Sequence, residues 1–91
     1  MYKILMVDDH AMVRTGLRAI LEEEIPEVAV QEAGTAHEGL DLLRDYEADA
    51  VILDLGLPGL SGLDMLKRIH RERPHLPVLV LSMYSEDQYG L

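Results

Sequence analysis

Apolar positions in this sequence gather in short runs that are separated by longer amphipathic stretches. The runs, with the residues that end them, predict strands at residues 4–7, 28–33, 50–54 and 77–82. A short apolar run of this kind is typical of a strand that is buried on both faces in a parallel sheet. The third run passes directly into Asp54 and then into residues that turn the chain. We therefore expect Asp54 at the carboxyl end of its strand.

The stretches between the runs carry apolar residues at helical spacing and predict helices at residues 10–24, 35–45 and 61–73. Thr35 opens a T-x-x-E capping box at the start of the second helix, and prolines follow the first and third helices. A similar capping pattern at Ser85 predicts the start of a fourth helix. The residues expected on the inner faces are Val13, Leu17, Ile20 and Leu21, then Ala36, Leu40 and Leu43, then Leu63, Leu66 and Ile69.

Strands and helices alternate along the whole chain, which places it in the α/β class. Such alternation implies parallel strands that are joined by right-handed helical crossovers. Residues 1–91 contain no internal repeat, low-complexity tract or linker, so we expect one domain. The chain has no cysteine, which excludes a disulfide framework and a thiolate metal site.

The net charge is −9, which argues against direct binding of nucleic acid or an anionic membrane by this chain. No apolar run approaches the roughly 20 residues that a membrane-spanning helix needs. The first residues lead straight into a strand, without the pattern of a signal peptide. These features predict a cytoplasmic domain with no membrane partner.

Acidic and hydroxyl side chains follow the ends of three predicted strands. Asp8 and Asp9 follow the first, Asp54 ends the third, and Ser82 ends the fourth. The carboxyl ends of parallel strands meet at one edge of the sheet, so the three carboxylates converge if the first and third strands are neighbours. Carboxylates so close repel one another unless a cation intervenes, and Mg²⁺ prefers oxygen ligands. His10, next to the acidic pair, has two readings, as a helix-capping surface residue or as a further metal ligand.

With these motifs the sequence resembles the receiver domain of two-component response regulators. The resemblance rests on residues 7–10, 52–62 and 78–82, in the family's order and spacing. The D-D-H opening and the L-S-M-Y segment are most similar to the NarL/FixJ (LuxR-type) subfamily. The family fold is a flavodoxin-like (CheY-like) three-layer sandwich with parallel strand order 2-1-3-4-5.

The resemblance implies a role for each residue at the strand ends. Asp54 matches the phosphoryl acceptor, Asp9 the direct Mg²⁺ ligand and Asp8 the ligand that acts largely through water. Gly56 matches the position whose backbone carbonyl binds the metal, and Ser82 matches the switch hydroxyl. The implied partner is a sensor histidine kinase, and the implied output is a process such as transcription. The domain would catalyse its own phosphorylation and dephosphorylation, and DNA would be contacted only by an effector domain outside this chain.

The sequence also departs from the family pattern. The family has a lysine at the end of a fifth strand, and neither Lys3 nor Lys67 matches that position. We therefore expect a receiver that is incomplete at its C-terminus, without the fifth strand and last helix. Its fourth strand would then lie at an open sheet edge, which favours a homodimer or a strand- or domain-swapped oligomer.

Two other functions remain open from the sequence. The first is an interaction or dimerisation module that works without phosphorylation, and the unmatched lysine favours it. The second is a phosphate-ester hydrolase with an aspartate nucleophile. Such hydrolases often have a second aspartate two residues after the nucleophile, where this chain has Gly56, which argues against that function.

Overall fold

The computed structural model describes residues 1–56 and 61–81, which form four strands and three helices in strict alternation. The elements are β1 (Tyr2–Val7), α1 (Ala11–Glu24), β2 (Val28–Ala33), α2 (Ala36–Asp45), β3 (Ala50–Asp54), α3 (Gly62–Glu72) and β4 (Val78–Leu81). Each predicted element is present within about two residues of its expected bounds. The helix predicted from Ser85 lies outside the described residues.

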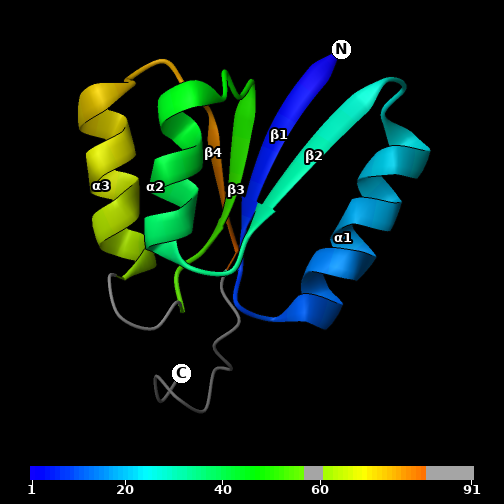
Figure 1. Cartoon of the computed structure of the whole chain (residues 1–91), viewed down its shortest axis with the longest axis horizontal. Coiled ribbons are helices and arrows are strands. Elements are labelled where there is room, and N and C mark those ends of the chain that lie inside the picture. The colour runs from blue at the N-terminus through cyan, green and yellow to red at the C-terminus, as the bar shows by residue number, and fades with distance from the viewer. Residues whose placement is uncertain (57–60, 82–91) are drawn as a thin grey trace, which may run out of the picture.

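The four strands form one parallel sheet in the order β2-β1-β3-β4 (Figure 1). The strand β1 lies between β2 and β3, with Val7 opposite Ala33 on one side and Leu53 on the other. The strand β4 pairs with β3, and Asp54 lies opposite Leu81. This strand order confirms the predicted flavodoxin-like, CheY-like topology, and it makes β1 and β3 neighbours.

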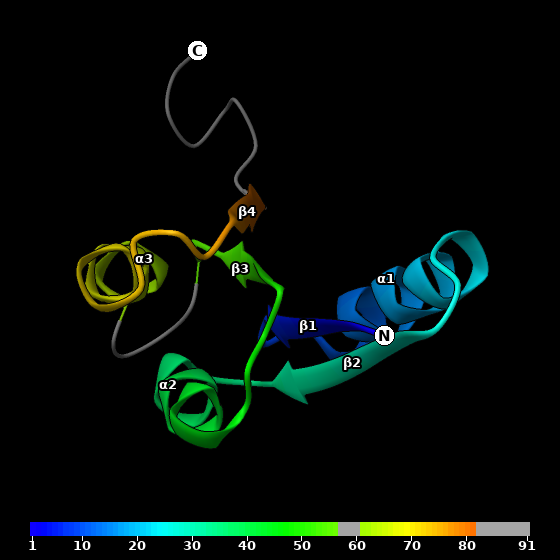
Figure 2. The same cartoon turned by 90° about the horizontal axis from the view of Figure 1, so that it is seen from above.

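The helices cover the sheet on both sides and complete a three-layer arrangement. Figure 2 shows α2 and α3 on one face and α1 on the other. Side chains along β1 alternate between the two faces, as strand geometry requires. Leu5 and Val7 belong to the hydrophobic cluster under α2 and α3, whereas Ile4 and Met6 belong to the cluster under α1.

Two apolar side chains that were expected on inner helix faces are exposed instead. In α1, Leu17 and Leu21 pack on the sheet, but Ile20 lies beside this stripe and is 57% exposed. In α3, the buried stripe runs through Met65 and Ile69. Leu63 lies outside that stripe and is 49% exposed. Both predictions were wrong because neighbouring apolar residues allowed two overlapping stripes, and packing selected only one of them.

Two hydroxyl side chains cap the N-termini of α2 and α3, the two helices that share one face of the sheet. The Thr35 hydroxyl accepts a hydrogen bond from the Glu38 backbone N–H at 3.1 Å, and the Ser61 hydroxyl accepts one from the Asp64 N–H at 3.1 Å. The Thr35 cap was predicted from the sequence. Within residues 1–56 and 61–81, no helix is long and apolar enough to cross a membrane.

Candidate functional site

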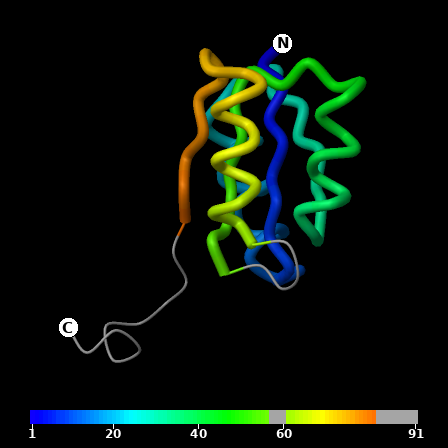
Figure 3. Tube along the Cα trace, turned by 90° about the vertical axis from the view of Figure 1, so that its left-hand side faces the viewer, coloured from blue at the N-terminus to red at the C-terminus, as the bar shows by residue number. Residues whose placement is uncertain are grey.

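The candidate site lies where β1 and β3 end, and Figure 3 shows the turns that follow these strands at the same end of the molecule. Asp54 is the last residue of β3, and Asp8 follows directly after β1. The Asp8 N–H donates to the Ala33 carbonyl at 3.0 Å, so β1 stays paired with β2 through this residue. Adjacent parallel strands therefore bring the two aspartates side by side.

The alternation of side chains along each strand directs both aspartates toward the face that carries α1. Met6 and Ile52 belong to the cluster under α1. Asp8 and Asp54 each come two residues later and share that face, because side chains in a strand repeat with a period of two. One ligand atom from each of Asp8, Asp9, His10 and Asp54 lies within 4.8 Å of the others. The convergence that the strand order predicted is thus present.

Both strand-end aspartates are buried, and in each one carboxylate oxygen accepts a backbone hydrogen bond while the other accepts none from the described residues. Asp8 is 1% exposed and Asp54 is 0% exposed. Asp8 Oδ1 accepts the His10 backbone N–H at 2.7 Å, and Asp54 Oδ1 accepts the Gly56 N–H at 2.8 Å. The Oδ2 atom of each residue is buried and has no hydrogen-bond partner among the residues that the structure describes. Buried carboxylate oxygens are costly unless a donor or a cation compensates them, so the site fits a bound cation.

The donor set suits a hard divalent ion. Asp9 adds a third carboxylate, and its side chain is 32% exposed at the rim of the site. Mg²⁺ is held by a few carboxylate oxygens together with water molecules, and the cluster supplies carboxylate oxygens of this kind. Gly56 lies next to Asp54 through its N–H, at the position expected to supply a carbonyl ligand. Ser82, expected at the end of the fourth strand, lies outside the described residues.

His10 lies beside the acidic cluster, where its ring is a counter-charge for the carboxylates when it is protonated. Its Nδ1 atom is 3.0 Å from Asp8 Oδ1, 3.0 Å from Asp9 Oδ1 and 3.8 Å from Asp54 Oδ2. The hydrogen bond with Asp8, followed by the charge of Asp9, raises the pKa of His10 above its ordinary value. His10 occupies the N-cap position of α1, yet its side chain makes no capping hydrogen bond. Its side chain is therefore directed to the carboxylates and not to the helix.

Two further residues touch the site in ways that the motif alone does not show. Arg14, on the first turns of α1, donates a hydrogen bond to the backbone carbonyl of Asp8. Gly62, the first residue of α3, packs against the main chain of Asp54. Neither contact has a sequence signal, because each depends on how a helix lies against a strand end.

Comparison with known proteins places this chain within one family. Residues 4–91 match the family described as the response regulator receiver domain. The transcriptional activator protein ExaE of Pseudomonas putida is 41% identical over 83 residues, which cover 91% of this chain and 39% of ExaE. The nitrate/nitrite response regulator protein NarP of Escherichia coli is 33% identical and is matched over 99% of this chain and 43% of NarP. The chain thus spans less than half the length of these curated relatives.

Solved structures show the same fold. The response regulator protein TrrA of Thermotoga maritima, crystallised in complex with Mg(2+)-BeF, superposes with a TM-score of 0.86 at 32% identity. That match covers 100% of this chain and 77% of TrrA. A CheY-like receiver domain protein of Methanospirillum hungatei superposes with a TM-score of 0.85 at 28% identity, over 99% of this chain and 70% of the other.

Proposed function

The chain belongs to the response regulator receiver domain family, with relatives of the NarL/FixJ type, and from this premise we propose that Asp54 accepts a phosphoryl group from a sensor histidine kinase. The observation that carries the proposal is the pair of buried Oδ2 atoms on Asp8 and Asp54, neither of which has a hydrogen-bond partner within residues 1–56 and 61–81. An unpaired carboxylate oxygen in a buried site is available to bind a cation or to attack an electrophile.

The metal set of the proposal is Asp8, Asp9, Asp54 and the backbone carbonyl of Gly56. Asp9 would bind Mg²⁺ directly, and Asp8 would act largely through water. When bound, Mg²⁺ offsets the charge of the carboxylates and of the phosphoryl oxygens. The three carboxylates already lie together in the protein, so binding requires no rearrangement of their strands.

In the proposed transfer, a carboxylate oxygen of Asp54 attacks the phosphorus of a phosphohistidine. The new oxygen–phosphorus bond forms as the nitrogen–phosphorus bond breaks, and the imidazole leaves with the electron pair of that bond. The Gly56 N–H holds Asp54 Oδ1 at 2.8 Å, which orients the carboxylate before the donor arrives. Such pre-orientation is a large part of what phosphoryl transfer needs from a protein.

The proposed output is a conformational switch that regulates a process such as transcription. The Ser82 hydroxyl would hydrogen-bond the phosphoryl group and report its presence to the rest of the domain. Hydrolysis of the acyl phosphate in the same site would return the domain to its starting state. Contact with DNA would come from an effector domain beyond the described fold, because this chain carries a net charge of −9.

Binding of beryllofluoride, which imitates a phosphoryl group on a carboxylate, tests the proposal against the phosphorylation-independent interaction module. Fluorine NMR should show a bound signal only when Mg²⁺ is present, in the 91-residue chain or in a version extended by the family's fifth strand and last helix. Asp54→Asn should abolish the signal. Asp41→Asn is the matched control, because Asp41 is a carboxylate on α2 with a 72% exposed side chain.

The outcomes separate the two functions. A Mg²⁺-dependent signal that is lost only in Asp54→Asn supports phosphoacceptor chemistry. A folded protein that gives no bound signal in either length favours the interaction module. A bound signal that persists in Asp54→Asn would show that beryllofluoride binds at a residue other than Asp54.

A further inference from the structure

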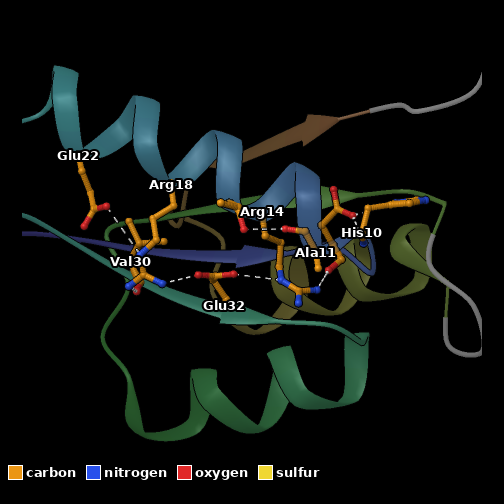
Figure 4. Close-up of polar contacts among 9 residues, drawn as sticks. His10, Ala11, Arg14, Arg18, Glu22, Val30 and Glu32 are labelled. Carbon is orange, nitrogen blue, oxygen red and sulfur yellow. Dashed lines mark hydrogen bonds and ion pairs between the residues drawn. The ribbon is translucent and has the colours of Figure 1, made fainter.

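Arg14 connects α1 to the ends of both β1 and β2. Its guanidinium donates a hydrogen bond to the backbone carbonyl of Asp8. Its Nε lies 3.0 Å from Glu32 Oε1 on β2, and Figure 4 shows this contact between Arg14 and Glu32. The Arg14 side chain is 21% exposed and that of Glu32 is 26% exposed, so the pair is largely shielded from water. The Arg14 side chain thus links Asp8, at the end of β1, to α1 and to β2.

Glu32 fixes the guanidinium of Arg14 on the β2 side of the site. Its other oxygen, Oε2, pairs with Arg18, which also donates to the Val30 carbonyl at 2.9 Å (Figure 4). Two arginines one turn apart on α1 therefore share one carboxylate. Only Arg14 reaches Asp8, and Arg18 anchors the same helix to β2 further from the site.

These contacts leave the main chain of Asp8 little freedom. Its N–H is bonded to Ala33, its carbonyl accepts from Arg14, and its Oδ1 accepts the His10 N–H. The remaining polar atom is Oδ2, which is buried and has no hydrogen-bond partner in the described part of the chain. With both main-chain groups and one carboxylate oxygen held, the direction of Oδ2 is fixed by the surrounding bonds.

We propose that the Arg14–Glu32 pair is a positioning device that holds Asp8 in the orientation needed to bind a divalent cation. Arg14 is not a ligand, because its contact is with the carbonyl of Asp8 and not with its carboxylate. Glu32 pairs with Arg14 on the side away from the carboxylates of the site. This inference rests on the proposed Mg²⁺ site and names the residues that shape it.

A positioning role and a purely electrostatic role of Arg14 predict opposite changes in Mg²⁺ affinity when this residue is substituted. Arginine near an acidic site repels an incoming cation, so removal of its charge should strengthen Mg²⁺ binding if electrostatics alone decides. Loss of a positioning contact should instead weaken binding, because the ligand that Arg14 holds becomes less ordered. Substitution of partners behind metal ligands typically costs 10-fold or more in metal affinity.

Isothermal titration with Mg²⁺ alone, on the same protein and its variants, distinguishes these effects. Arg14→Gln should lower the Mg²⁺ affinity by about 10-fold, the lower end of the usual range, since Arg14 acts through the main chain. Arg18→Gln, the matched control, removes the same charge and a contact with the same carboxylate, but it should lower the affinity much less than Arg14→Gln because Arg18 does not contact Asp8. Glu32→Gln should weaken Mg²⁺ binding. The double variant Arg14→Gln/Glu32→Gln should bind Mg²⁺ no more weakly than Arg14→Gln alone, because both substitutions disrupt the same Arg14–Glu32 interaction.

A readout without metal tests the same contact independently. The His10 amide donates to Asp8 Oδ1 at 2.7 Å, so its hydrogen exchange reports how well Asp8 is held. Exchange should be faster in Arg14→Gln than in Arg18→Gln. Arg14→Lys has a single side-chain nitrogen, which can reach either Asp8 or Glu32 but not both. It should therefore give intermediate values of Mg²⁺ affinity and of His10 exchange. This variant replaces Arg14→Gln in the test if Arg14→Gln does not fold.

The possible results are decisive for the proposal. Unchanged or tighter Mg²⁺ binding in Arg14→Gln and Arg14→Lys, with His10 exchange equal to that of Arg18→Gln, would overturn the positioning role. An unmodified protein that binds no Mg²⁺ would instead overturn the proposed function, and the exchange measurement would still decide whether Arg14 holds Asp8.

Discussion

Gly62, at the start of α3, lies against the main chain of Asp54, at the end of β3. A Cβ atom on Gly62 would lie 2.4 Å from the Asp54 carbonyl oxygen and 2.6 Å from the Cα of Leu55. Both separations are shorter than 3.0 Å, a distance below which real Cβ atoms essentially never approach other heavy atoms. The absence of a side chain at position 62 therefore allows α3 to begin directly against the residue that we propose as phosphoacceptor.

Gly62→Ala should destabilise the fold and disturb the site. The atoms in the way are backbone, so either α3 or the end of β3 must move, and overpacking of this kind costs about 1–3 kcal/mol. Urea unfolding followed by circular dichroism measures the loss. Gly16→Ala is the control, because a Cβ there meets nothing within 4 Å and an alanine inside α1 should stabilise the protein by about 0.5–1 kcal/mol. Equal stability of Gly62→Ala and the unmodified protein would contradict the close packing.

The sequence predicted the elements and the cluster of aspartates because both depend on local patterns. Prolines and hydroxyl caps mark the helix ends, and apolar runs mark the strands, so the bounds agreed within about two residues. Asp8 and Asp54 follow such runs directly. Once the strands are parallel and adjacent, their carboxylates must meet.

The contacts that refine the site were not predictable in the same way. Arg14 and Glu32 lie 18 residues apart, and their pairing depends on how α1 crosses β2. The tight approach at Gly62 depends on how the start of α3 lies against the end of β3. The wrong placements of Ile20 and Leu63 have a similar cause, because an amphipathic pattern with several apolar neighbours does not fix the rotation of a helix.

Mg²⁺ should stabilise the fold, and the effect should depend on Asp9. A ligand that binds only the folded state at ten times its Kd adds about 1.4 kcal/mol, and we expect binding at millimolar Mg²⁺. Thermal unfolding with and without Mg²⁺ measures this shift. Asp9→Ala should remove most of it, whereas Asp41→Ala, on the exposed face of α2, should leave it intact. The same thermal midpoint with and without Mg²⁺ in the unmodified protein would show that the cluster is not a metal site.

In the metal-free protein, the pKa of His10 should lie above the ordinary value of about 6.5, because the hydrogen bond with Asp8 and the charge of Asp9 favour the imidazolium. Its protonation therefore adds stability that is fully present below the unfolded pKa and is lost as the pH rises through the folded pKa. Titration of the His10 ring by NMR measures the value.

Two changes should lower the pKa of His10. Asp9→Asn removes a negative charge 3.0 Å from Nδ1, and saturating Mg²⁺ neutralises the same carboxylates. A His10 pKa at or below 6.5 in the metal-free protein would contradict the counter-charge role.

The edge at β4 should promote association of the chain with itself. Within the described residues β4 pairs only with β3, and Leu79 is 60% exposed on this edge strand. An exposed apolar edge strand invites pairing with another chain, and a lysine on the edge blocks it. Light scattering of the 91-residue chain should show concentration-dependent oligomers that Leu79→Lys reduces. Ile20→Lys is the control, because Ile20 on α1 is 57% exposed and its replacement removes a similar amount of apolar surface. This variant should not change association. A monodisperse monomer at high concentration would refute the edge argument.

The central claim is that Asp54 is the phosphoacceptor, and mass-spectrometric mapping of the site of phosphorylation tests it. A version extended by the family's fifth strand and last helix is treated with a small phosphodonor and Mg²⁺, beside its Asp54→Asn variant. We predict one modification, on Asp54, that requires Mg²⁺ and is absent from Asp54→Asn, because an amide is no nucleophile here. Modification of another residue, or equal labelling of the Asp54→Asn variant, would contradict the assignment.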